Sequence, residues 1–319
     1  MNKPLLSICL RTYNNQEFII EALEGIFMQK VNFNLEFIYS DDCSEDSSFE
    51  LVRNAIKDKN QFINVHLKKQ PKNLGMIDNL LYLLNNCKGD YIAMCDGDDY
   101  WRDPHKTQKQ VDFLEANPDY EVCFTNVSTI RENGEIIKEK LINDGRRTDY
   151  EMKHLPTWVP VSTKIFRNRD FNSLSRTVPG DDMYMLLYQS KLGKIKFLDI
   201  VTGAYRYQSR GTYSSLEVSK RKDYELKTHM ECMDLVTKDL YPKYQNLILK
   251  KIVELRYLDK KLYLERLLDF KSFMKKYSNR FSKWESIKIN CIIDVLRILD
   301  FIGLYGEKSL MLRIINKTI

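Results

Sequence analysis

The sequence predicts an α/β protein with a mostly parallel central sheet flanked by helices, followed by a helical region at the C-terminal end. Short apolar segments alternate with longer segments of helical period through the first hundred residues, as in βαβ units. Polar and acidic motifs directly follow several of the apolar segments. From about residue 216 onward there is almost no glycine or proline, which is typical of successive helices.

The predicted strands are short runs of branched and aromatic residues. In the first half of the fold they cover residues 5–10, 35–39 and 91–95, with a weaker run at 63–67. Further along the chain, less regular segments could extend the same sheet and shape an acceptor pocket. These later strands are expected at residues 121–125, 159–166, 196–200 and 203–207.

Two segments between the early strands have the apolar spacing of helices that pack on a sheet. Residues 16–29 place Ile19, Leu23 and Ile26 at steps of three and four, and residues 76–86 repeat the pattern. Alternation of these helices with the strands makes the first hundred residues a doubly wound half. Ligands of such folds bind at the carboxyl ends of the strands.

Three carboxylates, Asp96, Asp98 and Asp99, directly follow the predicted strand 91–95. Alternate residues of an extended chain point the same way, so Asp96 and Asp98 can converge on one ion. Paired carboxylates at this edge of a sheet suit a hard divalent cation that holds a diphosphate. An acidic turn is the alternative, since Asp-Gly is a strong turn signal. The cluster indicates nucleotide handling but does not select a reaction.

Composition is that of a globular protein, with 43% hydrophobic and 29% charged residues and a net charge of +6. The N-terminal residues lack a signal-peptide pattern, and the seven cysteines show no two-residue pairing. We therefore expect a cytoplasmic protein with reduced thiols and no nucleic-acid partner.

Four short motifs then occur in a characteristic order. They are Arg11-Thr12-Tyr13-Asn14, the run from Ser40 to Asp46, the Asp96 cluster, and Gly180-Asp181-Asp182. In order, spacing and strand context the chain resembles family 2 glycosyltransferases of the GT-A fold over roughly residues 4–210. The resemblance implies an inverting enzyme that moves a sugar from a nucleoside diphosphate sugar to a hydroxyl.

The resemblance also implies which residues bind the nucleotide. By position Asp42 should accept the N3 hydrogen of uracil, because an ionised carboxylate is a pure acceptor, and this makes a UDP-linked donor the leading expectation. Cys43 stands where the family has glycine, which puts the geometry of that turn in question. The other implied nucleotide contacts are Thr12, Tyr13, Asn14, Asn73 and Asp96.

For the chemistry, the resemblance implies Asp98 as the ligand of Mn²⁺ or Mg²⁺, with Asp96 bound to ribose or metal. Asp182 is in the position of the catalytic base and Asp181 in the supporting position. The alternative is that both acids only stabilise the start of a helix. Further contacts to the diphosphate or acceptor are assigned to Asp99, Trp101 and Arg206.

The predicted domains are a GT-A catalytic domain over residues 1–215 and a basic amphipathic helical region over 216–319. Within the first, residues 1–103 form the nucleotide-binding half and residues 104–215 the acceptor half. The helical region could attach peripherally to the inner face of the cell membrane, where a lipid-linked acceptor would be, or pack its apolar face internally. The apolar stretch 289–305 is interrupted by charges and does not indicate a membrane span.

The predicted pathway is synthesis of lipopolysaccharide, capsule or exopolysaccharide, an expectation that comes from the usage of the family alone. Three alternatives stay open. One is sugar transfer onto polyprenyl phosphate, whose acceptor needs no base. The others are a nucleotidyltransferase and a non-catalytic scaffold that binds nucleotide sugars.

Overall fold

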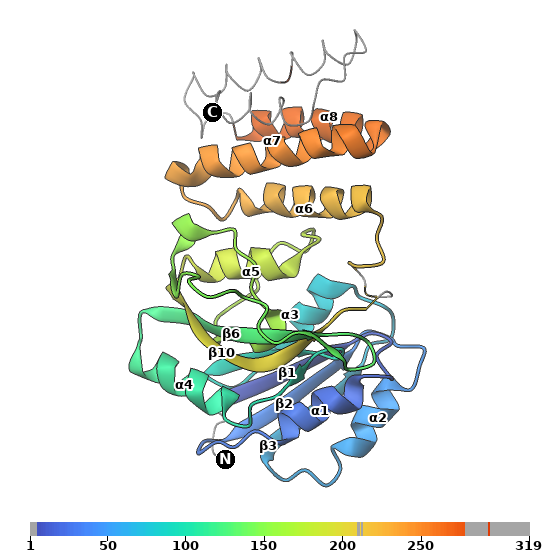
Figure 1. The fold of residues 1–319 in the computed structure, drawn as a ribbon, viewed down its shortest axis with the longest axis vertical. Coiled ribbons are helices and arrows are strands. Elements are labelled where there is room, and N and C mark those ends of the chain that lie inside the picture. Colours follow the sequence, from blue (N-terminus) through green and yellow to red (C-terminus); the bar gives the residue numbers. More distant parts are fainter. Residues whose placement is uncertain (1–4, 209–210, 212, 278–292, 294–319) are drawn as a thin grey trace. The chain divides into compact units, whose positions relative to one another are not determined.

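The computed structural model describes residues 5–208, 211, 213–277 and 293 of the chain (Figure 1). The chain divides into two compact units. The first comprises Met1–Arg176 with Asp181–Gly211, and the second comprises Thr177–Gly180 with Thr212–Ile319. Within the described ranges, every helix is too short or too polar to cross a membrane.

The first half of the central sheet is parallel. Its strands are β1 (Leu6–Thr12), β2 (Leu35–Asp41), β3 (Phe62–Lys69) and β4 (Tyr91–Asp96), and they lie in the order β3-β2-β1-β4. All four were predicted from their apolar runs. Because the chain leaves β1 toward β2 on one side and returns to β4 on the other, the carboxyl ends of β1 and β4 flank the switch point where such sheets bind ligands.

The second half continues the sheet in the order β4-β9-β6-β10-β5. Strand β9 (Ile165–Arg167) is antiparallel to both neighbours, β6 (Tyr120–Ile130) and β10 (Lys194–Arg206) are parallel to each other, and β5 (Tyr100–Trp101) is antiparallel to β10. Two short strands pair off this path: β7 (Ile136–Lys138) with β6, and β8 (Asp149–Tyr150) with β10. The sheet is therefore mixed but mostly parallel, as predicted.

Two predicted strands differ from the structure. Of residues 159–166, only the end is extended in β9, because Ser162 and Thr163 lie in a short 3₁₀ turn whose carbonyls accept hydrogen bonds from the side chains of Trp101 and Gln110. The runs predicted at 196–200 and 203–207 form the single strand β10, and register shifts between Leu198 and Gly203 join them.

Helices α1 (Ile19–Phe27), α2 (Ser48–Ala55) and α4 (Lys106–Ala116) bury their apolar residues in one core cluster with alternate residues of the parallel strands. Helix α3 (Met76–Asn86) packs on β1 and β2, and Asn79 on α3 lies within hydrogen-bond distance of Ser40 on β2. The observed α1 is shorter than the predicted 16–29, whereas α3 has the predicted bounds.

The second unit contains consecutive helices, α6 (Val218–Cys232), α7 (Tyr241–Leu258) and α8 (Lys260–Lys276), in which α7 packs on both α6 and α8 (Figure 1). The apolar face of α8 is buried, so over these residues the amphipathic pattern reflects internal packing. Membrane contact of this region stays a prediction. Apart from Ile293, the stretch 289–305 lies outside the described residues.

Lys106, the first residue of α4, is fully buried with its ammonium 4.2 Å from the ring centroid of Trp101. Its Nζ lacks a hydrogen-bond partner among the residues described. Burial lowers the pKa of Lys106 to about 7. The unfolded chain therefore binds more protons between pH 7 and the ordinary lysine value, and this lysine makes stability rise with pH across that range.

We expect Lys106→Met to raise the free energy of unfolding at pH 7 by about 1–3 kcal/mol, because it removes an unpaired buried cation while keeping the volume. The variant should also lose the increase in stability between pH 7 and pH 10. Chemical denaturation across this pH range measures both effects, with Lys109→Met on the exposed face of α4 as control. A less stable Lys106→Met protein would show instead that the ammonium stabilises the core.

Candidate functional site

The site lies where β1, β2 and β4 end, and the strand register brings their following motifs together. Thr12 is paired with Asp41 across β1 and β2, and Arg11 is paired with Asp96 across β1 and β4. The first three motifs of the sequence therefore share one edge of the sheet, as the parallel arrangement requires.

The turns after β1 and β2 are joined to each other by hydrogen bonds. The backbone N–H of Asn14 donates to Ser44 Oγ at 2.9 Å, and the backbone N–H of Glu45 donates to Asn14 Oδ1 at 2.9 Å. Asn14 and Cys43 both have positive φ, at 55° and 67°. Cys43 thus adopts the left-handed conformation for which glycine is favoured, and the turn keeps its geometry despite the substitution. Tyr13 is 45% exposed and is free to cover a ligand.

Thr12, one of the predicted nucleotide contacts, is the last residue of β1, and that role stays a prediction. Its side chain is buried, and its hydroxyl lies 2.8 Å from the hydroxyl of Tyr39. Its methyl group packs so closely on Gly97 that a Cβ there would come within 2.4 Å of Thr12 Cγ2. Thr12 therefore packs against the acidic turn. This contact leaves no room for a side chain at position 97, which explains why glycine separates Asp96 from Asp98.

Asp42 and Asn73 meet at the loop before α3. Asp42 accepts hydrogen bonds from the backbone N–H groups of Leu74 at 2.7 Å and Gly75 at 3.0 Å, and Asn73 Oδ1 also accepts from Gly75. Burial raises the pKa of Asp42, and the two N–H donors oppose that rise. Each carboxylate oxygen keeps a second lone pair for a ligand. Asp42 also holds this loop in place, a role that its motif did not reveal.

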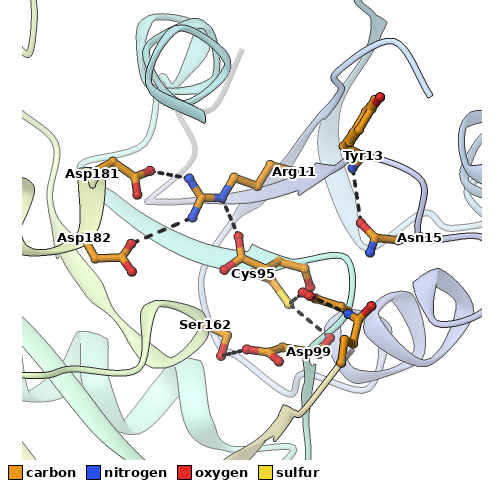
Figure 2. Close-up of polar contacts among 11 residues, drawn as sticks. Arg11, Tyr13, Asn15, Cys95, Asp99, Ser162, Asp181 and Asp182 are labelled. Carbon is orange, nitrogen blue, oxygen red and sulfur yellow. Dashed lines mark hydrogen bonds and ion pairs between the residues drawn. The ribbon is translucent and has the colours of Figure 1, made fainter. Parts of the chain in front are cut away.

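Asp99 is buried and fully engaged within the protein. It accepts hydrogen bonds from the backbone N–H of Arg206 at 3.0 Å and from Ser162 Oγ at 2.8 Å (Figure 2). Burial, and then the charge of Asp98, raise the pKa of Asp99. Both oxygens join the acidic turn to β10 and to the 3₁₀ turn, and the predicted contact of Asp99 with diphosphate or acceptor stays a prediction.

Asp98 is the more accessible member of the pair. Gln208 donates its side-chain amide to Asp98 Oδ2 at 2.7 Å. Burial, and then the charge of Asp96, raise the pKa of Asp98 to about 6. The charges of Arg11 and Arg206 oppose this rise without cancelling it. In the part of the chain that the structure describes, no group of three His, Cys, Asp or Glu side chains is arranged to hold a metal ion.

Arg206 and Trp101 were also predicted to contact diphosphate or acceptor, and those contacts stay predictions. The guanidinium of Arg206 is buried and donates to the backbone carbonyls of Asp98 and Glu132 and to the carboxylate of Glu21. Trp101 is 1% exposed and donates its indole N–H to the carbonyl of Ser162. In this structure both side chains fix the backbone around the acidic turn.

Arg11 links the acidic cluster to the start of helix α5 (Asp181–Gln189). Its guanidinium pairs with Asp96 and with Asp181, and lies 3.9 Å from Asp182 (Figure 2). Burial alone would raise the pKa of Asp181, but the charge and hydrogen bond of Arg11, together with a hydrogen bond from Asp182 and the charge of Lys164, outweigh it and the pKa of Asp181 is lowered. Asp181 is thereby held as a buried carboxylate in the supporting position.

Asp182 differs from its neighbour because 52% of its side chain is exposed. Desolvation, and then the charge of Asp181, raise the pKa of Asp182 to about 8. The exposed half of the side chain lets solvent screen part of this effect. Asp182 is consequently the solvent-accessible member of the acidic pair, and its role as the base stays a prediction.

Three residues of the site had no role assigned from the sequence: Arg11, Ser162 and Gln208. Arg11 stands inside the first motif, and its position beside three acidic motifs was the one available signal. Gln208 is two residues from Arg206, for which a contact with diphosphate or acceptor was predicted. Nothing near Ser162 in the sequence marked it as a partner of Asp99.

Comparison with known proteins supports the assignment made from the motifs. The family model "Glycosyl transferase family 2" matches residues 7–185. An uncharacterized protein of Mycobacterium tuberculosis is 30% identical over 227 residues, which is 70% of this chain and 65% of the relative. The chain thus spans somewhat less than two thirds of the length of that relative.

Two solved structures share the fold. Staphylococcus aureus TarS 1-349 in complex with UDP-GlcNAc has a TM-score of 0.65 at 15% identity, covering 96% of this chain and 90% of TarS 1-349. The mannosyltransferase PcManGT from Pyrobaculum calidifontis, in complex with GDP-Man and Mn²⁺, has a TM-score of 0.56 at 14% identity, covering 100% of this chain and 86% of PcManGT. The fold is that of the GT-A glycosyltransferases, and the chain belongs to glycosyl transferase family 2.

We expect Arg11→Met to destabilise the protein by about 3–5 kcal/mol, because it leaves the buried carboxylate of Asp181 unpaired. In the wild type the lowered pKa of Asp181 contributes stability above the ordinary aspartate pKa, and this is lost as pH falls through the folded-state value. Adding Asp181→Asn to Arg11→Met should recover part of the loss. Arg53→Met, which breaks an exposed pair with Glu50, should cost less than about 1 kcal/mol in the same denaturation assay. Equal losses for the two arginines would contradict this account.

Proposed function

We propose that this chain is an inverting, metal-assisted glycosyltransferase that moves a sugar from a UDP-sugar to a hydroxyl of a glycan or lipid-linked acceptor. The observation that carries the proposal is the gathering of Asp42, Asp98 and Asp182 around one sheet edge, with Arg11 between the acidic cluster and α5. The three carboxylates have different surroundings and can therefore take different roles.

The choice of uridine rests on Asp42. Its oxygens already accept two backbone N–H groups, and the remaining lone pairs can accept the imide N–H of uracil but would face the lone pair of cytosine N3. TarS binds UDP-GlcNAc and PcManGT binds GDP-Man, so likeness of fold does not decide the base. We assign Tyr13 to cover the base or ribose, with Asn14 and Asn73 bordering the same space.

A divalent cation fits the chemistry of the acidic turn. Mg²⁺ and Mn²⁺ prefer oxygen ligands, and Mg²⁺ in particular is usually held by one or two carboxylates together with substrate phosphates. Asp98 supplies such a carboxylate, and its raised pKa reports the negative charge that a cation would neutralise. Asp96 is the second candidate, although in this structure it pairs with Arg11. When bound, the metal would neutralise charge that develops on the leaving diphosphate.

In the proposed reaction the acceptor oxygen attacks the anomeric carbon from the face opposite the diphosphate. The bond from that carbon to the diphosphate oxygen breaks, and the acceptor proton passes to Asp182. A carboxylate within hydrogen-bond reach is sufficient if proton removal is concerted with attack. Asp181, fixed by Arg11, orients the first turn of α5 that carries the base.

We place the reaction in the synthesis of lipopolysaccharide, capsule or exopolysaccharide, following the usage of the family. Such transferases act on the cytoplasmic side of the cell membrane, which agrees with the localisation expected from the sequence. Peripheral attachment would bring the site to a lipid-linked acceptor. Most apolar residues of the described helices α6–α8 are buried, whereas Val218, Leu258, Leu264 and Leu268 are exposed, and contact would be made by these residues and by charged side chains.

The donor is tested by thermal stabilisation with UDP, GDP, CDP and dTDP, each with and without Mn²⁺. UDP with Mn²⁺ should stabilise the wild type most, by about 2.7 kcal/mol at a hundredfold excess over Kd. Asp98→Ala should lose the part of the shift that depends on the metal, whereas the exposed control Asp112→Asn should keep it. An equal shift with GDP would contradict the role given to Asp42, and a shift indifferent to Mn²⁺ would contradict the role given to Asp98.

The base is tested with Asp182→Asn, which we expect to lower kcat by about 10²–10⁴ while leaving UDP affinity unchanged. In the wild type kcat/KM should rise with pH as Asp182 loses its proton and level off near or below pH 8, because solvent screens the shift. The variant should lose this dependence. Unchanged turnover would favour transfer onto polyprenyl phosphate, whose acceptor needs no base.

A further inference from the structure

The first unit contains a cavity of about 650 Å³ that none of the site assignments above uses. The volume falls within the range of about 300–1,000 Å³ that is usual for pockets of small ligands. Its walls come from the segment between β7 and β8, from the loop before the 3₁₀ turn, and from the end of β10. The lining residues are Leu141, Ile142, Asn143, Asp144, Gly145, Arg146, Trp158, Tyr205 and Tyr207.

Three aromatic rings form one wall of this pocket. Trp158 meets Tyr205 edge to face at 6.1 Å between centroids, and Tyr205 meets Tyr207 in the same manner at 5.5 Å. Trp158 is 48% exposed and Tyr207 is 52% exposed. Large aromatic side chains are costly to leave in water, and the two half-exposed rings, each in contact with Tyr205, form one apolar surface that a ligand can cover.

Arg146 fixes the position of this wall. Its guanidinium donates to the carbonyl of Trp158, to Thr157 Oγ1 and to the hydroxyl of Tyr150, the last at 2.8 Å. Asn143 and the carboxylate of Asp144 lie beside it on the rim. The pocket therefore combines flat apolar faces with charged and amide groups able to form hydrogen bonds.

The end of β10 connects the pocket with the acidic cluster. Side chains of an extended chain alternate in direction, and Arg206 and Gln208 contact Asp98 while Tyr205 and Tyr207 line the pocket. The pKa of Tyr205 is raised by burial and then by the charges of Asp99 and Asp98. The pocket and the acidic cluster thus lie on opposite sides of one short segment, residues 205–208.

We propose that this pocket is the acceptor subsite and binds a pyranose ring stacked on Trp158 and Tyr207, with its hydroxyls toward Asn143 and Asp144. A pyranose presents C–H groups on one face and hydroxyls around its edge, which matches aromatic rings bordered by polar groups. The inference rests on the proposed glycosyl transfer and adds the class of acceptor, a saccharide.

A polyprenyl chain fits this pocket poorly. Asp144 pairs with Lys140, and Arg146 is hydrogen-bonded within the protein. A polyprenyl chain would place hydrocarbon against these charged groups and remove them from water with no new hydrogen bond in return. A saccharide keeps those groups hydrogen-bonded. The pocket thus favours transfer to a sugar hydroxyl over transfer to polyprenyl phosphate. The sugar of the donor could occupy the same pocket, so the experiment must distinguish donor sugar from acceptor sugar.

The test uses saturation-transfer NMR on the full chain with the methyl glycosides of glucose, galactose, mannose and N-acetylglucosamine, in the presence of UDP and Mn²⁺. At least one glycoside should give a signal with the wild type. The signal should fall at least fivefold in Trp158→Ala and in Tyr207→Ala, and should be retained in Trp158→Phe, which keeps a ring for stacking. Thermal unfolding of each variant shows that it is folded.

Tyr13→Ala is the reciprocal control, since it should weaken UDP binding and leave the glycoside signal intact. No signal from any glycoside with the wild type, or equal signals from the wild type and Trp158→Ala, would overturn the inference. So would weaker binding of UDP-GlcNAc but not of UDP to Trp158→Ala, because the pocket would then hold the donor sugar. UDP binding is measured separately, so its absence would refute the proposed donor without being confused with a failure of the pocket.

Discussion

The arrangement of the site depends on one buried cation, the guanidinium of Arg11. It lies at the end of β1 and pairs with acids from two distant parts of the chain, Asp96 after β4 and Asp181 at the start of α5. Several carboxylates gathered in a region of low polarity repel one another, and an unpaired one would be strongly destabilising. Arg11 removes part of that repulsion and holds Asp181 ionised. Asp98 and Asp182 are more exposed than Asp99 and Asp181, and burial raises the pKa of both.

A second constraint is the shape of the acidic turn. Thr12 packs against Gly97, while Ser162 and the backbone N–H of Arg206 donate hydrogen bonds to Asp99. Two consecutive acids of one motif therefore have different surroundings. Asp99 is buried and hydrogen-bonded within the protein, whereas Asp98 is partly exposed. The same strand end that secures Asp99 also carries the aromatic wall of the pocket. Because a single segment borders both places, the position of an acceptor would be fixed relative to the cluster that binds the donor.

The order of the parallel strands, helix α3 and the mostly parallel sheet could be predicted because each depends on local periodicity that the sequence displays directly. The observed strand β10 and the 3₁₀ turn at Val161–Thr163 could not, because they depend on register shifts and on side chains from elsewhere in the fold. Asp42 and Asp98 follow parallel strands whose carboxyl ends meet at one edge of the sheet, so their closeness could be anticipated, whereas the closeness of Asp182 to Arg11 comes from the fold. The burial and hydrogen-bond partners of Thr12, Asp99, Trp101 and Arg206 could not be anticipated, because a motif gives the identity of a side chain but not its burial.

The sequence by itself determined the family, the class of fold and the strand ends at which chemistry is concentrated, because these depend on short-range patterns and on their order along the chain. Only the tertiary structure decided which polar side chains are accessible and which are buried in hydrogen bonds and ion pairs within the protein. That choice depends on contacts between residues such as Arg11 and Asp181, which are 170 positions apart and have no mutual signal in the sequence. The aromatic pocket arose in the same way, from Trp158 and Tyr207 brought together by folding.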